Sequence, residues 1–141
     1  MDVGAFRARS DRLGGGAVIA VGASPGKGNG IFATRRIRAR EIIEEAPVIV
    51  LPGAEIEHLE KTALRDYYFL WGAEHEDAAV LLGLGTLCNH SYQPNAAFDI
   101  RLESRTIRFV ALRDIAAGEE ITTNYNGRPD NPKPVWFDVL P

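Results

Sequence analysis

Two polar stretches decide how this chain folds: NHSYQPN at residues 89–95 and GEEITTNY at residues 118–125. The first contains no apolar run to bury and ends in Pro94 and Asn95, which indicates a tight polar turn. The second begins at Gly118, a turn-forming residue, and continues through β-branched residues to Tyr125. We therefore predict a polar turn and, later in the chain, a short strand that ends in a tyrosine.

Two further segments extend this pattern. Residues 26–33 (GKGNGIFA) form a glycine-containing turn, and residues 114–120 (DIAAGEE) lead into the second polar stretch. In this order and spacing, the segments resemble those of the SET-domain protein-lysine methyltransferases, and the resemblance covers residues 18–127. It implies a mainly β fold of the β-clip type, made of several small sheets with a knot-like crossing near the active site and one or two short helices.

The composition is that of one ordinary globular domain. The chain has 141 residues, of which 45% are hydrophobic and 25% charged, and both fractions are typical of soluble proteins. A net charge of −3 argues against nucleic acid as a direct ligand of the whole chain. Arginines gather in two segments, where a solvated surface is the simplest interpretation: Arg7, Arg9 and Arg12, then Arg35, Arg36, Arg38 and Arg40.

Cys88 is the single cysteine of the chain. It excludes a disulfide framework within the chain, and also the cysteine-rich zinc sites that flank many SET domains, so we expect no metal. Tyr92 stands where related motifs often carry a cysteine, in agreement with this expectation. No apolar run approaches the roughly 18 residues of a membrane span, and residues 1–12 lack the apolar core of a signal peptide. We expect an intracellular protein without membrane attachment, cytoplasmic in a bacterium, with the nucleus open to it in a eukaryotic or viral setting.

The chain divides into three parts. Residues 1–16 are polar and end in three glycines, which predicts a flexible arm. The resemblance implies a SET domain over residues 17–127 and a tail over residues 128–141 that completes the cofactor and substrate site. Apolar spacing at Ile56, Leu59 and Ala63 predicts a helix over residues 54–64. The remaining expectations are strands at 17–21, 42–51 and 121–125, a loop at 22–30, an extended aromatic stretch at 67–71 and a hairpin over 101–112.

Several short motifs resemble sites of other kinds but lack the features that those sites require. Residues 28–33 match the dinucleotide fingerprint G-x-G-x-x-A, but the polar, arginine-rich residues 34–40 do not continue as the helix that a pyrophosphate needs. Residues 22–28 approach a P-loop but lack its spacing and its Ser or Thr. The three histidines, His58, His75 and His90, show no spacing typical of metal ligands.

Methyl transfer from a sulfonium to an amine is an in-line displacement, which needs alignment and a neutral amine. Because a free lysine has a pKa of about 10.4, an apolar channel that lowers this pKa assists the reaction. The resemblance implies that Tyr125 supplies the catalytic hydroxyl, which orients the amine and contacts the methyl group of the donor. A phenol is a poor base at neutral pH. The residue before it, Asn124, is often Asp in the family.

The cofactor implied by the resemblance is S-adenosylmethionine, which leaves as S-adenosylhomocysteine. By the same resemblance, Asn89 binds the amino-acid part of this donor and His90 offers backbone groups to its adenine. The backbone of Lys27, Gly28 and Asn29 would hold the methionine part, since glycine lets a backbone approach a ligand closely.

The substrate channel is assigned to Tyr68, Phe98 and Thr123. Phe98 lacks the hydroxyl that fixes a water in some relatives, so addition of more than one methyl group is expected; simple core packing is an equally open reading. Trp136 and Phe137 lie in a short, proline-bounded tail, and we expect them to fold over the adenine of the donor in place of a zinc-bound tail.

Two functions from different classes remain at this point. The first is a protein-lysine N-methyltransferase that acts on a lysine of a basic protein, such as a histone or a ribosomal segment. The second is a catalytically inactive SET-like module that binds a protein or nucleic acid. The joint presence of Asn89, His90 and Tyr125 favours the enzyme. Formation of a homodimer is left open by the sequence.

Overall fold

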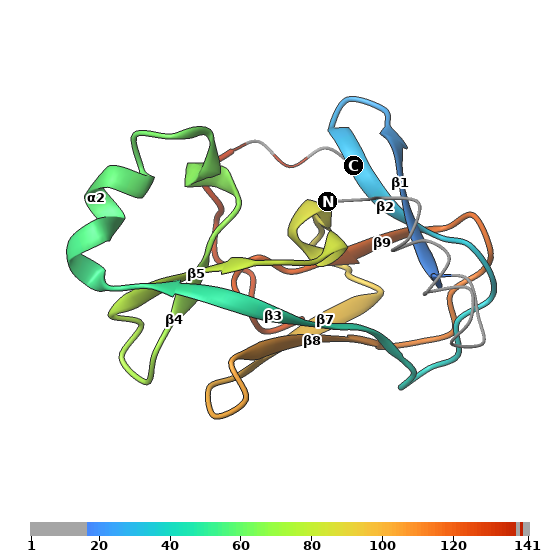
Figure 1. Cartoon of the computed structure of the whole chain (residues 1–141). Helices are drawn as coiled ribbons and strands as arrows, with labels where there is room; N and C mark the ends of the chain where they lie inside the picture. Colours follow the sequence, from blue (N-terminus) through green and yellow to red (C-terminus); the bar gives the residue numbers. More distant parts are fainter. Residues whose placement is uncertain (1–16, 138, 140–141) are drawn as a thin grey trace, which may run out of the picture.

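The computed structural model describes residues 17–137 and 139, and these residues are organised as two β-sheets (Figure 1). A four-stranded sheet has the order β1-β2-β9-β6, and a five-stranded sheet has the order β4-β5-β3-β8-β7. The strands are β1 (Ile19–Ser24), β2 (Gly28–Ala33), β3 (Ile42–Leu51), β4 (Phe69–Trp71), β5 (Asp77–Leu81), β6 (Asn89–His90), β7 (Ala96–Arg101), β8 (Thr106–Ala111) and β9 (Glu120–Thr123). The mainly β architecture expected from the sequence is therefore confirmed.

The structure describes only part of the predicted three-part division of the chain. The proposed arm, residues 1–16, lies outside the described residues, as do residues 138, 140 and 141 of the tail. The boundaries at residues 17–127 and 128–141 stay predictions. Among the helices of the described residues, none is both long and apolar enough to cross a membrane.

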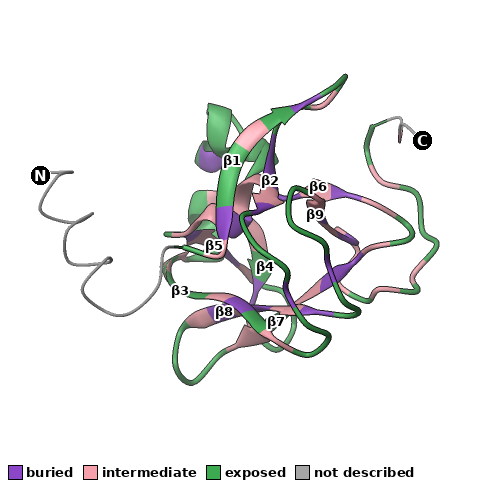
Figure 2. Cartoon of the chain, turned by 90° about the vertical axis from the view of Figure 1, so that its right-hand side faces the viewer, coloured by how far each residue is buried: buried purple, intermediate pink, exposed green. Residues whose placement is uncertain are grey.

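The five-stranded sheet follows the hydrophobic pattern of the sequence. β3 coincides with the Ile- and Val-rich run at residues 42–51 and pairs antiparallel with β5 on one side and β8 on the other. β7 and β8 form a hairpin whose second strand was expected, but whose first strand begins at Ala96, before the predicted range of 101–112. In it, Phe98 lies opposite Phe109 and Ile100 opposite Ile107. Along β8, buried residues alternate with less buried ones, which places Ile107, Phe109 and Ala111 in the core. Buried residues, purple in Figure 2, occur along β2, β8 and β9.

The prediction of a loop over residues 22–30 is wrong, because β1 and β2 form a hairpin there. Gly22 pairs with Gly30, and the turn is closed by a 2.9 Å hydrogen bond from the Lys27 N–H to the Ser24 carbonyl. A Cβ at Gly22 would lie 2.8 Å from the ring of Phe32. The glycine thus serves close packing within a strand, where the sequence alone favoured a loop.

The predicted helix over residues 54–64 is also wrong in its length. The α-helix α2 spans only Ile56–Leu59, between the 3-10 turns η1 (Gly53–Glu55) and η2 (Ala63–Asp66). The Thr62 hydroxyl ends it by donating to the Leu59 carbonyl at 2.7 Å and accepting from the Leu64 N–H at 3.2 Å. Leu59 is the one buried residue of α2, too little packing to hold a longer helix. The aromatic stretch at 67–71 is extended only from β4 onward.

A short parallel ladder brings the two polar motifs together. In it, Asn89 pairs with Thr122 and His90 pairs with Thr123, so β6 lies against β9. Buried Asn95 closes the intervening turn onto β9, because its Nδ2 donates to the Glu120 carbonyl at 2.7 Å and its Oδ1 accepts from the Thr122 N–H at 2.9 Å. Residues far apart in sequence thus become neighbours, in agreement with the crossing that the family resemblance implies.

Candidate active site

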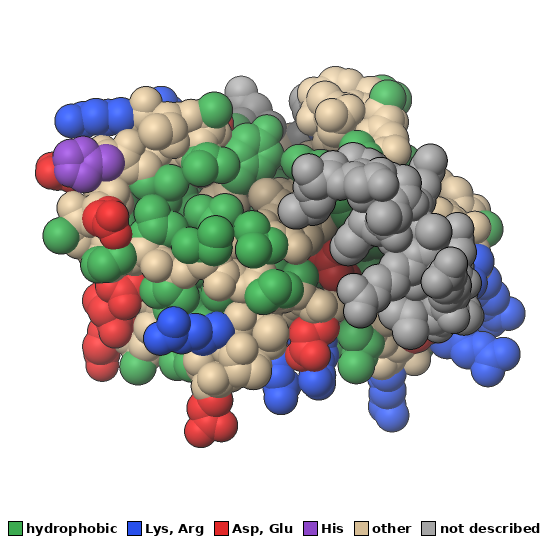
Figure 3. All heavy atoms as spheres, in the orientation of Figure 1, with side chains coloured by type: hydrophobic (Ala, Val, Ile, Leu, Met, Phe, Trp, Pro, Cys, Tyr) green, Lys and Arg blue, Asp and Glu red, His purple; other side chains and the backbone are tan. Residues whose placement is uncertain are grey.

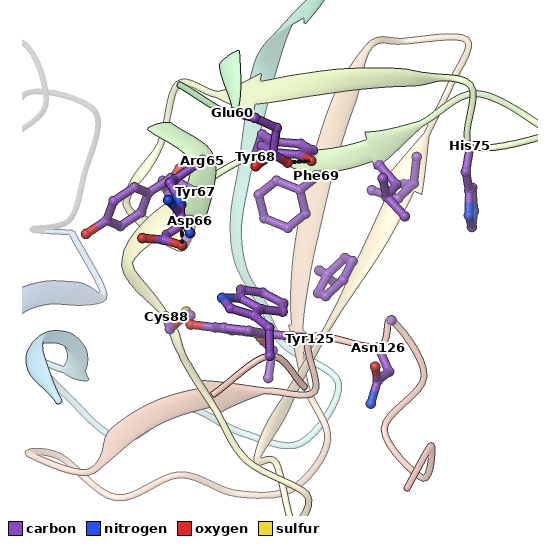
Figure 4. Close-up of a pocket in the computed structure, with 18 residues that line it drawn as sticks. Glu60, Arg65, Asp66, Tyr67, Tyr68, Phe69, His75, Cys88, Tyr125 and Asn126 are labelled. Atoms are coloured by element: carbon purple, nitrogen blue, oxygen red, sulfur yellow. Dashed lines mark hydrogen bonds and ion pairs between the residues drawn. The ribbon is translucent and has the colours of Figure 1, made fainter. Parts of the chain in front are cut away.

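A cavity of about 560 Å³ lies beside the end of β9 (Figure 4). Aromatic and aliphatic residues supply much of its wall, together with charged residues at its rim. The hydrophobic side chains visible in Figure 3 gather in the middle of one face of the molecule, with acidic side chains at the end where α2 lies. The cavity is lined by Glu60, Arg65, Asp66, Tyr67, Tyr68, Phe69, Leu70, His75, Gly85, Thr86, Cys88, Phe98, Ile100, Thr123, Tyr125, Asn126, Gly127 and Trp136.

Tyr125 lies two residues beyond the end of β9, so the predicted strand over residues 121–125 stops short of the tyrosine. The residue is held at both of its ends. Its backbone N–H donates to His90 Nδ1 at 3.0 Å, and its hydroxyl donates to the Cys88 carbonyl at 2.5 Å. Figure 4 shows the ring of Tyr125 reaching toward Cys88. Burial, more than the neighbouring Cys88, Tyr67 and Glu120, raises the pKa of Tyr125 well above its ordinary value. The phenol is therefore protonated at neutral pH, and its proton is directed at a carbonyl oxygen.

His90 is buried and bridges the two motifs. Its Nδ1 accepts a hydrogen bond, so in a neutral ring the proton is on Nε2. Burial, and to a lesser extent the charge of Lys27, lowers the pKa of His90. Within the described residues, Nε2 is buried without any hydrogen-bond partner. An unpaired buried donor is costly, so this position fits a ligand that accepts a hydrogen bond.

Asn89 of the NHSYQPN motif contacts both the GEEITTNY motif and the β1–β2 hairpin. Its Nδ2 donates to the Asn29 carbonyl at 3.1 Å and to Glu120 Oε2 at 3.0 Å. Lys27 belongs to the hairpin turn, and Gly28 has a φ of +75° with no atom within 4 Å of where a Cβ would lie. This positive φ explains the glycine, since other residues adopt it at a cost. The structure thus places Asn29 directly beside Asn89, with Lys27 and Gly28 next in the chain.

Of the residues predicted to surround the substrate or the donor, four line the same cavity as Tyr125: Tyr68, Phe98, Thr123 and Trp136. The other predicted donor residues do not line it: Lys27, Gly28, Asn29, Asn89 and His90. Phe98 packs edge-on against Phe69 with ring centroids 5.2 Å apart, and it also lines the cavity, so its role in a substrate channel stays a prediction. The Tyr68 hydroxyl is hydrogen-bonded to Glu60 on the opposite side of the cavity from Tyr125 (Figure 4).

The aromatic residues of the tail reach Tyr125. Trp136 stacks on Tyr125 with ring centroids 5.8 Å apart and planes 23° apart, although 66% of Trp136 stays exposed. Phe137 lies edge-on to His90, at 6.1 Å, and to Tyr125, at 5.9 Å. A large aromatic surface that is only half covered is suited to close over a planar ligand.

Side-chain amides anchor the tail, and sequence reasoning missed them. Asn124 Nδ2 donates to the Asn131 carbonyl at 2.7 Å, and Asn126 Nδ2 donates to the Lys133 carbonyl at 2.7 Å. The Tyr92 hydroxyl donates to the same Lys133 carbonyl at 3.0 Å. Tyr92 and Asn124, the two departures from the family motif, therefore both hold the tail against the site.

Other residues of the site also went unpredicted. The Cys88 carbonyl that accepts from Tyr125 carries no sequence signal, because every residue has the same backbone carbonyl. Burial is the main cause that raises the pKa of the Cys88 thiol to about 12, so this thiol is protonated and unsuited to nucleophilic chemistry. Across residues 17–137, no group of three or more His, Cys, Asp or Glu side chains is placed to hold a metal ion.

Known proteins resemble this chain in both sequence and structure. The SET domain family matches residues 28–126. A histone-lysine N-methyltransferase of Schizosaccharomyces pombe, specific for H3 lysine 37, is 32% identical over 113 residues, which cover 79% of this chain and 71% of that protein. A histone-lysine N-methyltransferase of Yarrowia lipolytica, specific for H3 lysine 36, is 34% identical over 110 residues, 71% of this chain but 14% of that protein.

Solved structures agree with this assignment. A protein of Plasmodium falciparum with a provisional name as a histone methyltransferase is 30% identical, has a TM-score of 0.63, and matches over 78% of this chain and 94% of its own. The Chaetomium thermophilum Polycomb Repressive Complex 2, bound to S-adenosylmethionine, is 26% identical with a TM-score of 0.66, over 81% of this chain and 16% of that chain. The family match extends over most of the chain and includes both motifs. The chain therefore belongs to the SET-domain family.

Proposed function

We propose that this chain is a protein-lysine N-methyltransferase that uses S-adenosylmethionine and acts on a lysine in a basic protein segment, such as a histone H3 tail. One observation carries the proposal: the Tyr125 hydroxyl stands in a largely apolar cavity, fixed by the Cys88 carbonyl, beside the β6–β9 ladder. The similarity to histone H3 methyltransferases supports a histone as the substrate.

The residues present fit the methyl donor. Asn89 Oδ1 has no hydrogen-bond donor among the described residues, and His90 Nε2 is buried without a partner. These two atoms, with the backbone of Lys27, Gly28 and Asn29, would hold the amino-acid part and the adenine, while Trp136 would cover the ring. When bound, S-adenosylmethionine supplies a methyl group on a sulfonium, which is open to attack by a neutral amine.

Tyr125 orients the substrate amine. Because the phenolic proton is used in the bond to the Cys88 carbonyl, the oxygen lone pairs remain free to accept an N–H of the lysine. That bond turns the lone pair of the nitrogen in one direction, which is the alignment that a displacement requires. The apolar wall contributed by Phe98 excludes water and disfavours the ammonium form, and Tyr68 and Thr123 complete the channel.

Charge on the rim of the cavity supports a basic partner. The segment from residue 55 to residue 77 carries seven acidic side chains against one lysine and one arginine. Two of the acids, Glu60 and Asp66, line the cavity itself. A surface of this sign attracts a lysine- and arginine-rich segment and raises its rate of encounter. A histone substrate would place the protein in the nucleus of a eukaryotic host, and dimer formation stays a prediction.

The test is methyl transfer to purified histone H3 from labelled S-adenosylmethionine, with the wild type and Tyr125→Phe side by side. We expect label on lysine with the wild type and a loss of about a hundredfold in kcat in the variant. Binding of S-adenosylhomocysteine and thermal stability, measured on both proteins, separate a lost hydroxyl from a lost fold.

The outcomes distinguish the two classes of function. Transfer at the wild-type rate by Tyr125→Phe would contradict the role of the hydroxyl. If the wild type binds S-adenosylhomocysteine but labels only another basic protein, the proposed enzymatic activity stands and the proposed histone substrate is wrong. A wild type that neither binds the product nor transfers methyl groups to any basic protein would favour an inactive SET-like binding module.

A further inference from the structure

Glu120, the first residue of β9, lies behind Asn89 and is held on both sides. Its Oε2 accepts from Asn89 Nδ2 at 3.0 Å, and its Oε1 accepts from the hydroxyl of buried Ser24 at 2.6 Å. Its backbone carbonyl accepts from Asn95 Nδ2 at 2.7 Å. The carboxylate is therefore fixed by Ser24 of β1 and Asn89 of β6, and the backbone of Glu120 is held by the turn that follows β6.

This arrangement determines which way the Asn89 amide faces. Both hydrogens of Nδ2 are engaged, one by the Asn29 carbonyl and one by Glu120 Oε2. A flipped amide would set Oδ1 against these two acceptors, and three oxygens would face one another without a proton between them. The flipped orientation is thus excluded, and Oδ1 is the atom that Asn89 has left to offer to a ligand.

The backbone makes room for this pair. A Cβ on Gly30 would lie 2.9 Å from Asn89 Nδ2 and 3.0 Å from Glu120 Oε2, so the side chains of both occupy the space beside a glycine. A negative charge on the N–H side of an amide polarises it and increases the negative partial charge on its oxygen. Glu120 consequently makes Asn89 Oδ1 a stronger hydrogen-bond acceptor. A positively charged group that donates a hydrogen bond is therefore favoured at that position.

We propose that Glu120 is a positioning residue, which acts through Asn89 and makes the site selective for a methyl donor that carries a free α-ammonium group. The inference rests on the proposed use of S-adenosylmethionine. It assigns to the second glutamate of the GEEITTNY motif a role in ligand selection. The neighbouring Glu119 has a different role, because its carboxylate pairs with Arg113 at 2.5 Å.

The test compares two ligands by titration calorimetry: S-adenosylhomocysteine and its analogue without the α-amino group. Glu120→Gln removes the charge but keeps an acceptor, and Glu120→Met removes both. For S-adenosylhomocysteine, we expect Kd to rise about threefold in the first variant and at least about tenfold in the second. For the analogue, both variants should stay within about twofold of the wild type. Glu119→Gln is the matched control and should bind both ligands as the wild type does.

A double-mutant cycle with Asn89→Ala tests the route of the effect. In the Asn89→Ala background, Glu120→Met should change the Kd of S-adenosylhomocysteine by no more than about twofold, because the residue through which it acts is gone. Equal weakening of both ligands, or no weakening at all, would overturn the inference. If Glu120→Met does not fold, Glu120→Gln still decides by the ratio of its effects on the two ligands. A wild type that binds neither ligand would overturn the proposed function, and this inference with it.

Discussion

Gly85 is the position where one added methyl group should cost the most. It lies in the turn η3 (Leu84–Leu87), and a Cβ there would overlap Cε2 and Cζ of Phe109, with Cδ2 at 2.9 Å. Phe109 is 1% exposed and is packed against Phe98 and Phe69, so its ring cannot move aside. We therefore predict that Gly85→Ala destabilises the protein.

The turn cannot retreat either. The carboxylate of Glu44 accepts from the N–H groups of Leu84 and Gly85, each at 2.9 Å. Such charge-assisted bonds contribute about 1.5–3 kcal/mol each, so breaking them brings no relief. Overpacking then costs about 2–3 kcal/mol, and the lower entropy of the unfolded Ala chain offsets about 0.4–1 kcal/mol of this. The net loss is about 1–2.5 kcal/mol, which corresponds to a Tm lower by roughly 3–8 °C.

Urea denaturation followed by tryptophan fluorescence measures this loss, because Trp71 is buried in the same core. Phe109→Leu supplies the control, since a smaller side chain leaves room for the Cβ. In that background, we expect Gly85→Ala to cost less than about 0.5 kcal/mol. The reasoning would be refuted by an unchanged stability of Gly85→Ala in the wild-type background, or by the same cost in both backgrounds.

Three further predictions follow from the contacts around the site. Asn95→Ala leaves the Glu120 carbonyl and the Thr122 N–H without their side-chain partner. The free energy of unfolding, measured by urea denaturation, should fall by about 2–4 kcal/mol. A loss below about 1 kcal/mol would mean that water replaces the amide. Since the pKa of His90 is lowered by folding, the unfolded chain binds its proton more readily, so stability should fall as the pH drops below about 6.5. Thermal melts of the wild type and of His90→Gln check this, and equal slopes for the two proteins between about pH 6.5 and pH 5 would contradict it. Phe98→Tyr adds a hydroxyl to the cavity wall and should shift the products toward monomethyl-lysine in mass spectra, while an unchanged ratio of products would assign Phe98 to packing alone.

Local patterns explain the parts of the fold that the sequence predicts well. β3 is rich in Ile and Val and is followed by Pro52 and Gly53, and β8 places Ile107, Phe109 and Ala111 at every second position, so each strand can be predicted without its partners. β5 is not readable in this way. Its adjacent residues Ala78 and Ala79 are both fully buried, so the strand shows no alternation between an inner and an outer face.

The candidate site shows the same division. Tyr125, Asn89 and His90 are marked by the motifs that carry them, and the structure brings them together. The role of Glu120 and the carbonyl of Cys88 depend on which strand lies beside which. The parallel pairing of β6 with β9 extends over two residues. Two residues are too few to show a repeating apolar pattern in the sequence, so only the family resemblance predicts this pairing.

The two-residue ladder between β6 and β9 also has a consequence for the order in which the protein matures. β9 lies between β2, near the start of the chain, and β6, so it joins segments that are synthesised much earlier. Contacts between such distant segments are formed slowly, because a long loop must close first. During synthesis, β9 and Tyr125 cannot take their places beside β2 and β6 until residue 125 has left the ribosome, and Trp136 follows later still. Methyl transfer therefore waits for the whole domain to fold.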